Sequence, residues 1–255
     1  MENNEKNEKE ENNDNKDNNN LIDLSKYNIV KVDKNEDISN CEELTYKVVI
    51  IGDPAVGKSS IIQNLVNESE PMKEYKATIG FDIFNYSAHV NDKLITMQIW
   101  DTCGLIEFSA CTPKLYNNVS LAIIVYAINK KETFENVQNW YNLLKLNSSA
   151  DTKVFIVGNK LDLENEREVS KEEGEKYVKD NSFKFFIETS AKEHKYVHDM
   201  FNKGLVELYE LNKFYKEDDN EEPQIDFKKR KDTFKLNNKQ NENKNKIGNN
   251  CCNIY

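Results

Sequence analysis

Apolar residues of this chain are concentrated between about Tyr46 and Leu211, and both ends of the chain are poor in them. Inside this stretch, short runs rich in β-branched and aromatic residues alternate with longer segments of helical character. The segments 84–90 and 93–100 alternate apolar and polar residues around an Asn-Asp pair, which predicts an antiparallel hairpin. The expected elements are strands at 47–51, 84–90, 93–100, 121–128, 153–157 and 183–187, and helices at 57–66, 131–146, 170–179 and 191–211.

The order of these elements predicts the fold class. After the hairpin, strands and helices alternate, which is typical of parallel strands joined by crossover helices. The sequence therefore predicts an α/β domain with a six-stranded, mostly parallel sheet, one antiparallel edge strand and helices on both faces. In such sheets ligands bind beyond the carboxyl ends of the strands, so functional residues are expected in the loops that follow the strands.

The two ends of the chain differ from this domain in composition. Residues 1–44 carry 13 acidic and 6 basic side chains, and nine of the first 20 residues are Asn. Such a segment buries too little apolar surface to offset the entropy lost on ordering, so we expect an acidic, disordered extension. A folded domain is expected over 45–212 and a flexible tail over 213–255, in which residues 227–246 hold eight Lys or Arg against two acids.

Composition and charge exclude several classes of protein. No apolar run approaches the roughly 20 residues that cross a bilayer, and the first residues do not resemble a signal peptide. The five cysteines lack disulfide or metal-binding spacing, which favours a reducing compartment on the cytosolic side. Of the net charge of −10, −5 falls on the folded domain, so nucleic acid is not expected to be the ligand.

The loop after the first predicted strand reads GDPAVGKS over residues 52–59 and leads into a predicted helix. This is a P-loop, in which glycines let the backbone approach a polyphosphate and successive N–H groups bind its oxygens. Lys58 neutralises phosphate charge and the Ser59 hydroxyl binds Mg²⁺, so the fold class becomes that of a P-loop NTPase. The candidate phosphate-binding residues are Gly52, Asp53, Ala55, Val56, Gly57, Lys58, Ser59 and Ser60.

Two later motifs select the base. In the sequence NKLD at 159–162, the carboxylate of Asp162 matches the N1–H and 2-amino group of guanine, a pattern that adenine lacks. In ETSAK at 188–192, a backbone N–H near Ala191 is expected to bind the guanine 6-oxo group, and Ser190 to steady Asp162. GTP or GDP is therefore the expected nucleotide. The candidate base-binding residues are Asn159, Lys160, Asp162, Ser190, Ala191 and Lys192.

The sequence WDTCGL at 100–105 follows another predicted strand. Asp101 is expected to hold Mg²⁺ through water, the Gly104 N–H to bind a γ-phosphate, and Thr78 to supply a second hydroxyl to the metal. Loops that contact both γ-phosphate and metal are ordered only while both are bound, so the sequence predicts a switch. The expected metal ligands are Ser59, Thr78 and Asp101, and the expected catalytic positions are Lys58, Thr78, Gly104 and Leu105.

With these motifs in this order, residues 45–212 resemble the Ras superfamily of small GTPases, and within it the Rab branch. The segment EYKATIG at 74–80 resembles a Rab first switch, and FENVQNW at 134–140 resembles a Rab third helix. Cys251 and Cys252 resemble the geranylgeranylated double-cysteine ends of Rab proteins. The resemblance implies a monomeric, Mg²⁺-dependent enzyme that hydrolyses GTP and controls vesicle trafficking.

The resemblance also implies partners and a location. The partners are a guanine nucleotide exchange factor, a TBC-type GTPase-activating protein, a prenyl transferase with its escort, a GDP-dissociation inhibitor and effectors. Two lipid chains on Cys251 and Cys252, together with the basic stretch 228–246, are sufficient for stable membrane attachment. The expected location is the cytoplasmic face of an intracellular membrane (endosome, Golgi or secretory vesicle), with a cytosolic pool. The sequence does not identify the organelle or the effectors.

Leu105 is the most informative departure from the family pattern, which has Gln at this position to orient the attacking water. A leucine cannot orient water, so intrinsic hydrolysis is expected to be slow. The chain has only two arginines, Arg167 and Arg230, and neither is in a switch segment, so an activating protein must supply an arginine. Two functions follow: a slowly hydrolysing switch, which the retained Lys58 and Ser59 favour, or a non-hydrolysing, GTP-bound membrane scaffold.

Overall fold

The computed structural model describes residues 23–32, 42–66, 77–110 and 113–217. The chain divides into two units, residues 1–211 and residues 212–255, and the sheet belongs to the first. Its strands are β1 (Ile29–Lys31), β2 (Glu43–Ile51), β3 (Phe81–Val90), β4 (Lys93–Thr102), β5 (Val119–Ala127), β6 (Lys153–Asn159) and β7 (Phe185–Thr189). The α-helices are α1 (Lys58–Val66), α2 (Ile106–Ala110), α3 (Lys131–Glu135), α4 (Val137–Asn147), α5 (Lys171–Asp180) and α6 (Val197–Glu217), and the 3-10 helices are η1 (Leu24–Lys26), η2 (Pro113–Leu115) and η3 (Leu161–Glu166).

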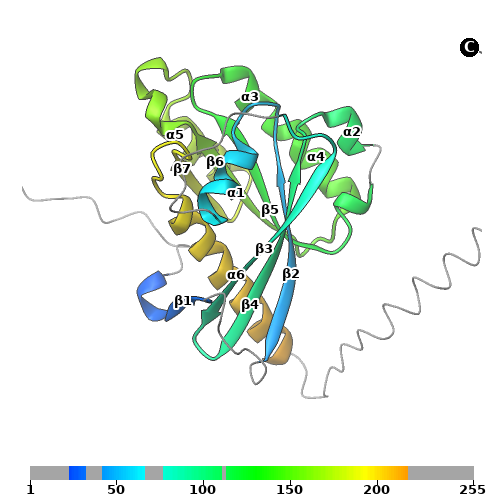
Figure 1. The fold of residues 1–255 in the computed structure, drawn as a ribbon. Coiled ribbons are helices and arrows are strands. Elements are labelled where there is room, and N and C mark those ends of the chain that lie inside the picture. Colours follow the sequence, from blue (N-terminus) through cyan, green and yellow to red (C-terminus); the bar gives the residue numbers. More distant parts are fainter. Residues whose placement is uncertain (1–22, 33–41, 67–76, 111–112, 218–255) are drawn as a thin grey trace, which may run out of the picture. The chain divides into compact units, whose positions relative to one another are not determined.

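The strands form one mixed sheet in the order β1-β3-β4-β2-β5-β6-β7 (Figure 1). Strands β4, β2, β5, β6 and β7 are parallel, whereas β3 pairs with β4 and β1 pairs with β3 in antiparallel fashion. The predicted hairpin, the mostly parallel sheet and the helices on both faces are confirmed. The parallel strands bring the loops that follow them to one end of the sheet, where α1 also begins.

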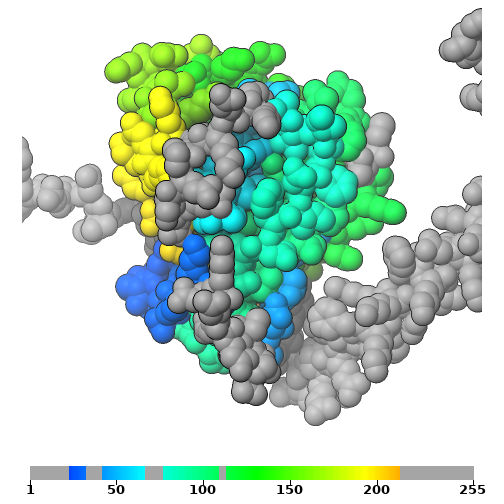
Figure 2. All heavy atoms as spheres, in the orientation of Figure 1, coloured from blue at the N-terminus to red at the C-terminus, as the bar shows by residue number. Residues whose placement is uncertain are grey.

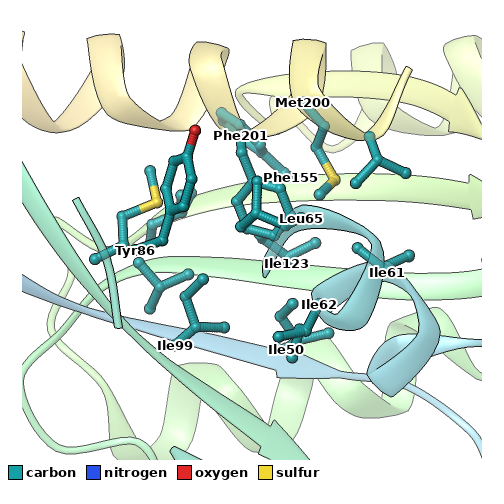
Figure 3. Packing of buried hydrophobic residues seen from close by; sticks show 14 of the residues in the cluster. Ile50, Ile61, Ile62, Leu65, Tyr86, Ile99, Ile123, Phe155, Met200 and Phe201 are labelled. Atoms are coloured by element: carbon teal, nitrogen blue, oxygen red, sulfur yellow. The ribbon is translucent and has the colours of Figure 1, made fainter. Parts of the chain in front are cut away.

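Two apolar layers cover the faces of the sheet. On one face, α1 and α6 pack on alternate residues of the strands, and Figure 3 shows Leu65 and Phe201 beside Phe155 and Ile123. On the other face, α4 packs its buried side chains against the opposite set of strand residues. The central strand β5 is buried on both faces, which explains its nearly continuous apolar sequence.

Two predicted helices differ from those in the structure. The helix expected at 131–146 is divided into α3 and α4, which meet at Asn136. The helix expected from residue 191 begins only at Val197. Ser190 and Lys195 instead exchange backbone hydrogen bonds, and His194 and Tyr196 have positive φ, so residues 191–196 form a closed turn before the helix. None of the helices among the described residues combines the length and apolar character needed to cross a membrane.

The seventh strand, β1, is the main departure from the predicted sheet. It lies within residues 1–44, which the sequence analysis expects to be disordered, yet residues 23–32 form η1 and β1 and pair with β3. Figure 2 shows this segment, in blue, at the surface of the domain. Its apolar residues Leu24, Tyr27 and Ile29 pack against the α1 and α6 layer. Three apolar side chains in an acidic stretch were too weak a pattern to predict a strand.

Tyr27 fastens this segment to α6. Its ring meets that of Tyr209 edge to face at 6.1 Å, and its hydroxyl donates to Glu210 Oε1 at 3.0 Å. Burial, together with the carboxylates of Glu210 and Glu207, raises the pKa of Tyr27 to about 12, so the hydroxyl stays protonated as a donor. Tyr209 in turn donates to Asp92 Oδ1 in the β3–β4 turn at 2.9 Å. The N-terminal segment, α6 and the hairpin are therefore linked.

We expect Tyr27→Ala to lower the free energy of unfolding by about 1–3 kcal/mol, because it removes both a ring contact and a hydrogen bond. Urea denaturation measures the effect. Val30→Ala is the matched control, since Val30 lies in the same N-terminal segment, on β1, and is 49% exposed. If Tyr27→Ala lowers the free energy of unfolding no more than Val30→Ala does, the contacts of Tyr27 contribute little to the stability of the domain.

Candidate functional site

The loops that the sequence analysis selected gather at the carboxyl end of the parallel strands (Figure 1). The segment 52–57 joins β2 to α1, residues 103–105 follow β4, and η3 and residues 190–196 follow β6 and β7. Hydrogen bonds between side chains and backbone connect these loops to one another, so they form a single site.

The P-loop wraps closely around the start of α1. Gly57 has a φ of +100°, and a Cβ there would lie 2.2 Å from Nδ2 of Asn159, so this position requires glycine. Lys58 is 5% exposed, and its ammonium donates to the carbonyl oxygens of Gly52 at 2.9 Å and Asp53 at 2.8 Å. The remaining predicted phosphate-loop residues, Ala55, Val56 and Ser60, lie in the same loop and in the first turn of α1.

Burial lowers the pKa of Lys58 to about 8. The nearby Asp101, Cys103 and Asp53 oppose this change, but desolvation of the ammonium is the larger effect. An ammonium in this position gains strongly from a negatively charged ligand. Lys58 is therefore suited to bind the phosphate oxygens of a nucleotide.

The three predicted Mg²⁺ ligands lie together. Ser59 Oγ is 2.8 Å from Thr78 Oγ1 and donates to Asp101 Oδ2 at 2.5 Å, and Thr78 Oγ1 is 3.4 Å from the same carboxylate oxygen. Asp101 is buried, its Oδ1 has no hydrogen-bond partner among the described residues, and burial raises the pKa of its carboxyl group. Two hydroxyls and a carboxylate with one oxygen still available are hard oxygen ligands of the kind that Mg²⁺ prefers.

The residues therefore fit a magnesium ion: Ser59 and Thr78 would hold it directly, and Asp101 through water. Bound there, the ion would neutralise phosphate charge during phosphoryl transfer. Across the described segments, no cluster of three or more His, Cys, Asp and Glu side chains is suited to a metal. The hydroxyl-based set is thus the metal site that these residues offer.

Gly104 brings the second switch against the P-loop. Its φ is +80°, and a Cβ there would lie 2.5 Å from Lys58 Nζ and 2.8 Å from backbone atoms of Asp53 and Pro54. Any side chain would separate the two loops, so glycine is required at this contact. Leu105, which follows, is 53% exposed and apolar, and it has no group to bind water.

The base-binding motifs are arranged by buried hydrogen bonds. Asn159 Nδ2 donates to Val56 O at 2.8 Å, while its Oδ1 accepts from Thr189 Oγ1 at 3.1 Å and from Ala191 N at 3.3 Å. A backbone N–H near Ala191 was expected to bind the guanine oxygen, and the N–H of Ala191 itself is directed at Asn159 in this structure. Ser190 Oγ donates to Asp162 Oδ1 at 2.6 Å, the contact that was expected.

Two lysines flank the same motif. Lys160 adopts a left-handed conformation, with φ +71°, and burial lowers its pKa. Lys192 lies with its ammonium 3.9 Å from Asp162 Oδ2 and is otherwise exposed. One carboxylate oxygen of Asp162 is thus bound by Ser190, and the other makes this long ion pair.

The structure adds supporting residues that the sequence analysis missed. Asn64 in α1 is buried and donates to Ala191 O at 3.0 Å, which joins the phosphate helix to the base loop. Arg167 makes two hydrogen bonds to the buried Glu188, at 2.6 and 2.9 Å, and two to Glu164. The sequence signal for Asn64 is that a polar residue stands among the apolar residues Ile61, Ile62 and Leu65 of the predicted helix.

Some predicted residues lie outside the described part of the chain. They are residues 1–22 and 33–41 of the acidic extension, residues 74–76 of the first-switch segment, and the tail beyond residue 217 with its basic stretch 227–246, Cys251 and Cys252.

Comparison with known proteins agrees with this site. The sequence signature of the Ras family matches residues 47–210. Rab-11C of Dictyostelium discoideum is 40% identical over 169 residues, which cover 66% of this chain and 75% of that protein. RABA5e of Arabidopsis thaliana is 38% identical over 175 residues, 69% of this chain and 79% of that protein. Rab11B of Nicotiana tabacum is 37% identical over 167 residues, 65% of this chain and 76% of that protein.

The fold and the site define the class as a P-loop guanine-nucleotide-binding protein. The chain belongs to the Ras family and is a small GTPase of the Rab type.

The pKa of Lys58 predicts how affinity for GDP depends on pH. Phosphate binding favours the protonated ammonium, so the pKa of Lys58 must rise when GDP binds. Affinity is therefore expected to fall as pH increases beyond about 8, by up to about tenfold per pH unit. Titration of wild type with a fluorescent GDP analogue between pH 7 and 9.5, in excess Mg²⁺, measures this.

Lys58→Arg is the control, because a guanidinium stays charged over this range. This variant is expected to bind more weakly, and any residual pH dependence that it shows reports the guanine base itself. If the GDP affinity of wild type changes with pH in the same way as that of Lys58→Arg, deprotonation of Lys58 does not control GDP binding.

Proposed function

We propose that this protein is a Rab-type switch with slow intrinsic GTP hydrolysis, which controls vesicle trafficking by recruiting effectors to an intracellular membrane while GTP is bound. The observation that carries the proposal is Leu105. This apolar side chain directly follows Gly104, which contacts Lys58, at the point where the Ras family places its water-orienting Gln. Lys58, Ser59, Thr78 and Gly104 are in place to bind phosphate and metal, but Leu105 cannot orient water.

The arginine of the folded domain does not compensate for this loss. Arg167 is engaged by Glu164 and Glu188 and donates to Val169 O, in the loop that supports the base. It is the one arginine among the described residues. An activating protein of the TBC type must then supply the positive charge, and it is also expected to supply an amide that orients water.

Exposed apolar side chains at the switches support effector recruitment. Ile79 is 95% exposed, and Phe81, Ile83 and Leu105 are also exposed. We call these four residues the switch patch. The ring of Phe81 stacks on Trp100 at 5.0 Å, and the ammonium of Lys47 lies 3.9 Å above the same indole ring. Exposed apolar side chains of this kind indicate a binding site for another protein.

Membrane attachment is proposed from the tail. Two prenyl chains on Cys251 and Cys252, with the basic stretch before them, would hold the protein on the cytoplasmic face of an endosome, Golgi membrane or secretory vesicle. A prenyl transferase with its escort would attach the chains. A GDP-dissociation inhibitor would maintain the cytosolic pool, and an exchange factor would load GTP.

Leu105 also supports a second function, a GTP-bound scaffold that never hydrolyses its nucleotide. The two functions differ in whether an activating protein restores turnover. The retained hydroxyl and carboxylate set of Ser59, Thr78 and Asp101 favours the switch, because a permanent scaffold has no need to stabilise developing phosphate charge.

Single-turnover GTP hydrolysis tests the proposal. We expect slow hydrolysis by wild type, an increase of at least about tenfold in Leu105→Gln, and acceleration of wild type by a TBC-type activating protein. Leu105→Ala is the matched control, since it removes the apolar side chain without adding an amide, and it should stay slow. Wild type that remains inert with every activator while Leu105→Gln recovers turnover would favour the scaffold.

Lipid attachment is tested separately. The Cys251→Ser/Cys252→Ser double variant, expressed in a eukaryotic cell, is expected to move from the membrane fraction to the soluble fraction, because no prenyl chain remains. Cys41→Ser is the control, and its distribution should match wild type. Membrane recovery of the double variant at the wild-type level would contradict the assigned anchor.

A further inference from the structure

Asp53 is a phosphate-loop residue whose side chain turns away from the phosphate site. Its Oδ1 accepts a hydrogen bond from Trp140 Nε1 at 2.7 Å, and its Oδ2 accepts one from Asn136 Nδ2 at 2.7 Å. Asn136 lies at the junction of α3 and α4, and Trp140 lies in the first turns of α4. Both carboxylate oxygens are therefore bound to residues more than 80 positions away in the sequence.

The arrangement resolves an electrostatic conflict. A carboxylate next to a polyphosphate repels it, unless the carboxylate is directed elsewhere and its charge is bound by donors. The two hydrogen bonds are short and involve a charged acceptor, which makes them stronger than bonds between neutral groups. The indole of Trp140 is 1% exposed, so its N–H would be buried without a partner if Asp53 were absent.

The backbone of Asp53 contacts two other functional elements of the site, Lys58 and the second switch. Its carbonyl oxygen accepts from Lys58 Nζ at 2.8 Å. A Cβ on Gly104 would lie 2.8 Å from the carbonyl carbon of Asp53, so the second switch also packs on this peptide. Pro54 follows directly, and its ring restricts the backbone there. A side chain that fixes the Asp53 peptide thus fixes the contacts made by both Lys58 and Gly104.

We infer that Asp53, Asn136 and Trp140 form a clamp that holds the P-loop in its nucleotide-binding shape, so that retention of the nucleotide depends on the α3–α4 junction. In this clamp Asn136 and Trp140 are positioning residues, since they act on the phosphates only through Asp53. The inference rests on the proposed binding of GDP and GTP at the P-loop. It assigns to the α3–α4 junction a role beyond covering the sheet.

The rate of GDP release measures the clamp. A fluorescent GDP analogue is loaded on the full-length protein and displaced by excess GDP in Mg²⁺ buffer. Asp53→Ala is expected to speed release by about tenfold or more, because both bonds are lost and Trp140 is left unpaired. Trp140→Phe, which keeps most of the ring but lacks the N–H, is expected to speed release by roughly threefold.

Two further variants separate positioning from general loss of stability. Asp53→Asn keeps one acceptor for Trp140 but turns an amide NH2 toward Asn136 Nδ2, so GDP release is expected to be faster than in wild type and slower than in Asp53→Ala. Tyr177→Phe removes a hydrogen bond of 2.9 Å from Tyr177 to Gln138 of the same helix α4 without touching the P-loop. It should lower the unfolding midpoint but leave GDP release unchanged.

The double variant Asp53→Ala/Trp140→Phe is expected to release GDP at the rate of Asp53→Ala, since the shared bond is already absent. Additive effects, or release from Asp53→Ala no faster than from Tyr177→Phe, would overturn the clamp. If Asp53→Ala fails to fold, Trp140→Phe and Asp53→Asn carry the same comparison. Wild type that retains no GDP would overturn the proposed function together with this inference, whereas tight wild-type binding with unchanged release in Asp53→Ala overturns only the inference.

Discussion

The site depends on the hydrogen bonds made by the buried side-chain amide of Asn159. With one side chain it binds the P-loop through Val56, the end of β7 through Thr189 and the loop after β7 through Ala191. Loops lack the regular backbone hydrogen bonds of helices and strands. The P-loop and the loop after β7 therefore keep one relative arrangement only if a single group forms hydrogen bonds with both of them. A buried amide is well suited to this, because it is donor and acceptor at once and is costly to leave unpaired. Gly57 makes the approach possible by having no side chain where Asn159 lies.

The same principle operates on the other side of the P-loop. There Asp53 is bound by Asn136 and Trp140, so the loop is fixed from β6 at one end and from the α3–α4 junction at the other. Asn64 adds a link from α1 to the base loop. Phosphate and base recognition are therefore parts of one hydrogen-bonded structure, and a change at either is expected to affect the other.

Much of the sheet and of the candidate site could be predicted from the sequence, for reasons that differ between the two. The sheet was predictable because buried parallel strands such as β5 have nearly continuous apolar sequences that end at loops. The site was predictable because close approach to phosphate demands glycine, lysine and serine at fixed spacing. The turn at 191–196 and strand β1 were not predictable in this way. The first depends on a backbone pair between Ser190 and Lys195, and the second on a few apolar contacts with distant residues, which local periodicity does not encode.

Leu105 affects both the hydrolysis chemistry and the exposed surface of the second switch. A leucine that is half exposed costs the fold little, because it fills no cavity and buries no polar group. Yet it lacks the amide that would orient water, and it adds exposed apolar area to the loop after β4, which the hydrogen bond from Cys103 N to Gly80 O joins to the segment before β3. Under the proposed function, slow hydrolysis would prolong the GTP-bound state, and the exposed leucine would add apolar area for a partner that binds this state. Both effects of leucine at this position would then act in one direction, toward a longer association with that partner.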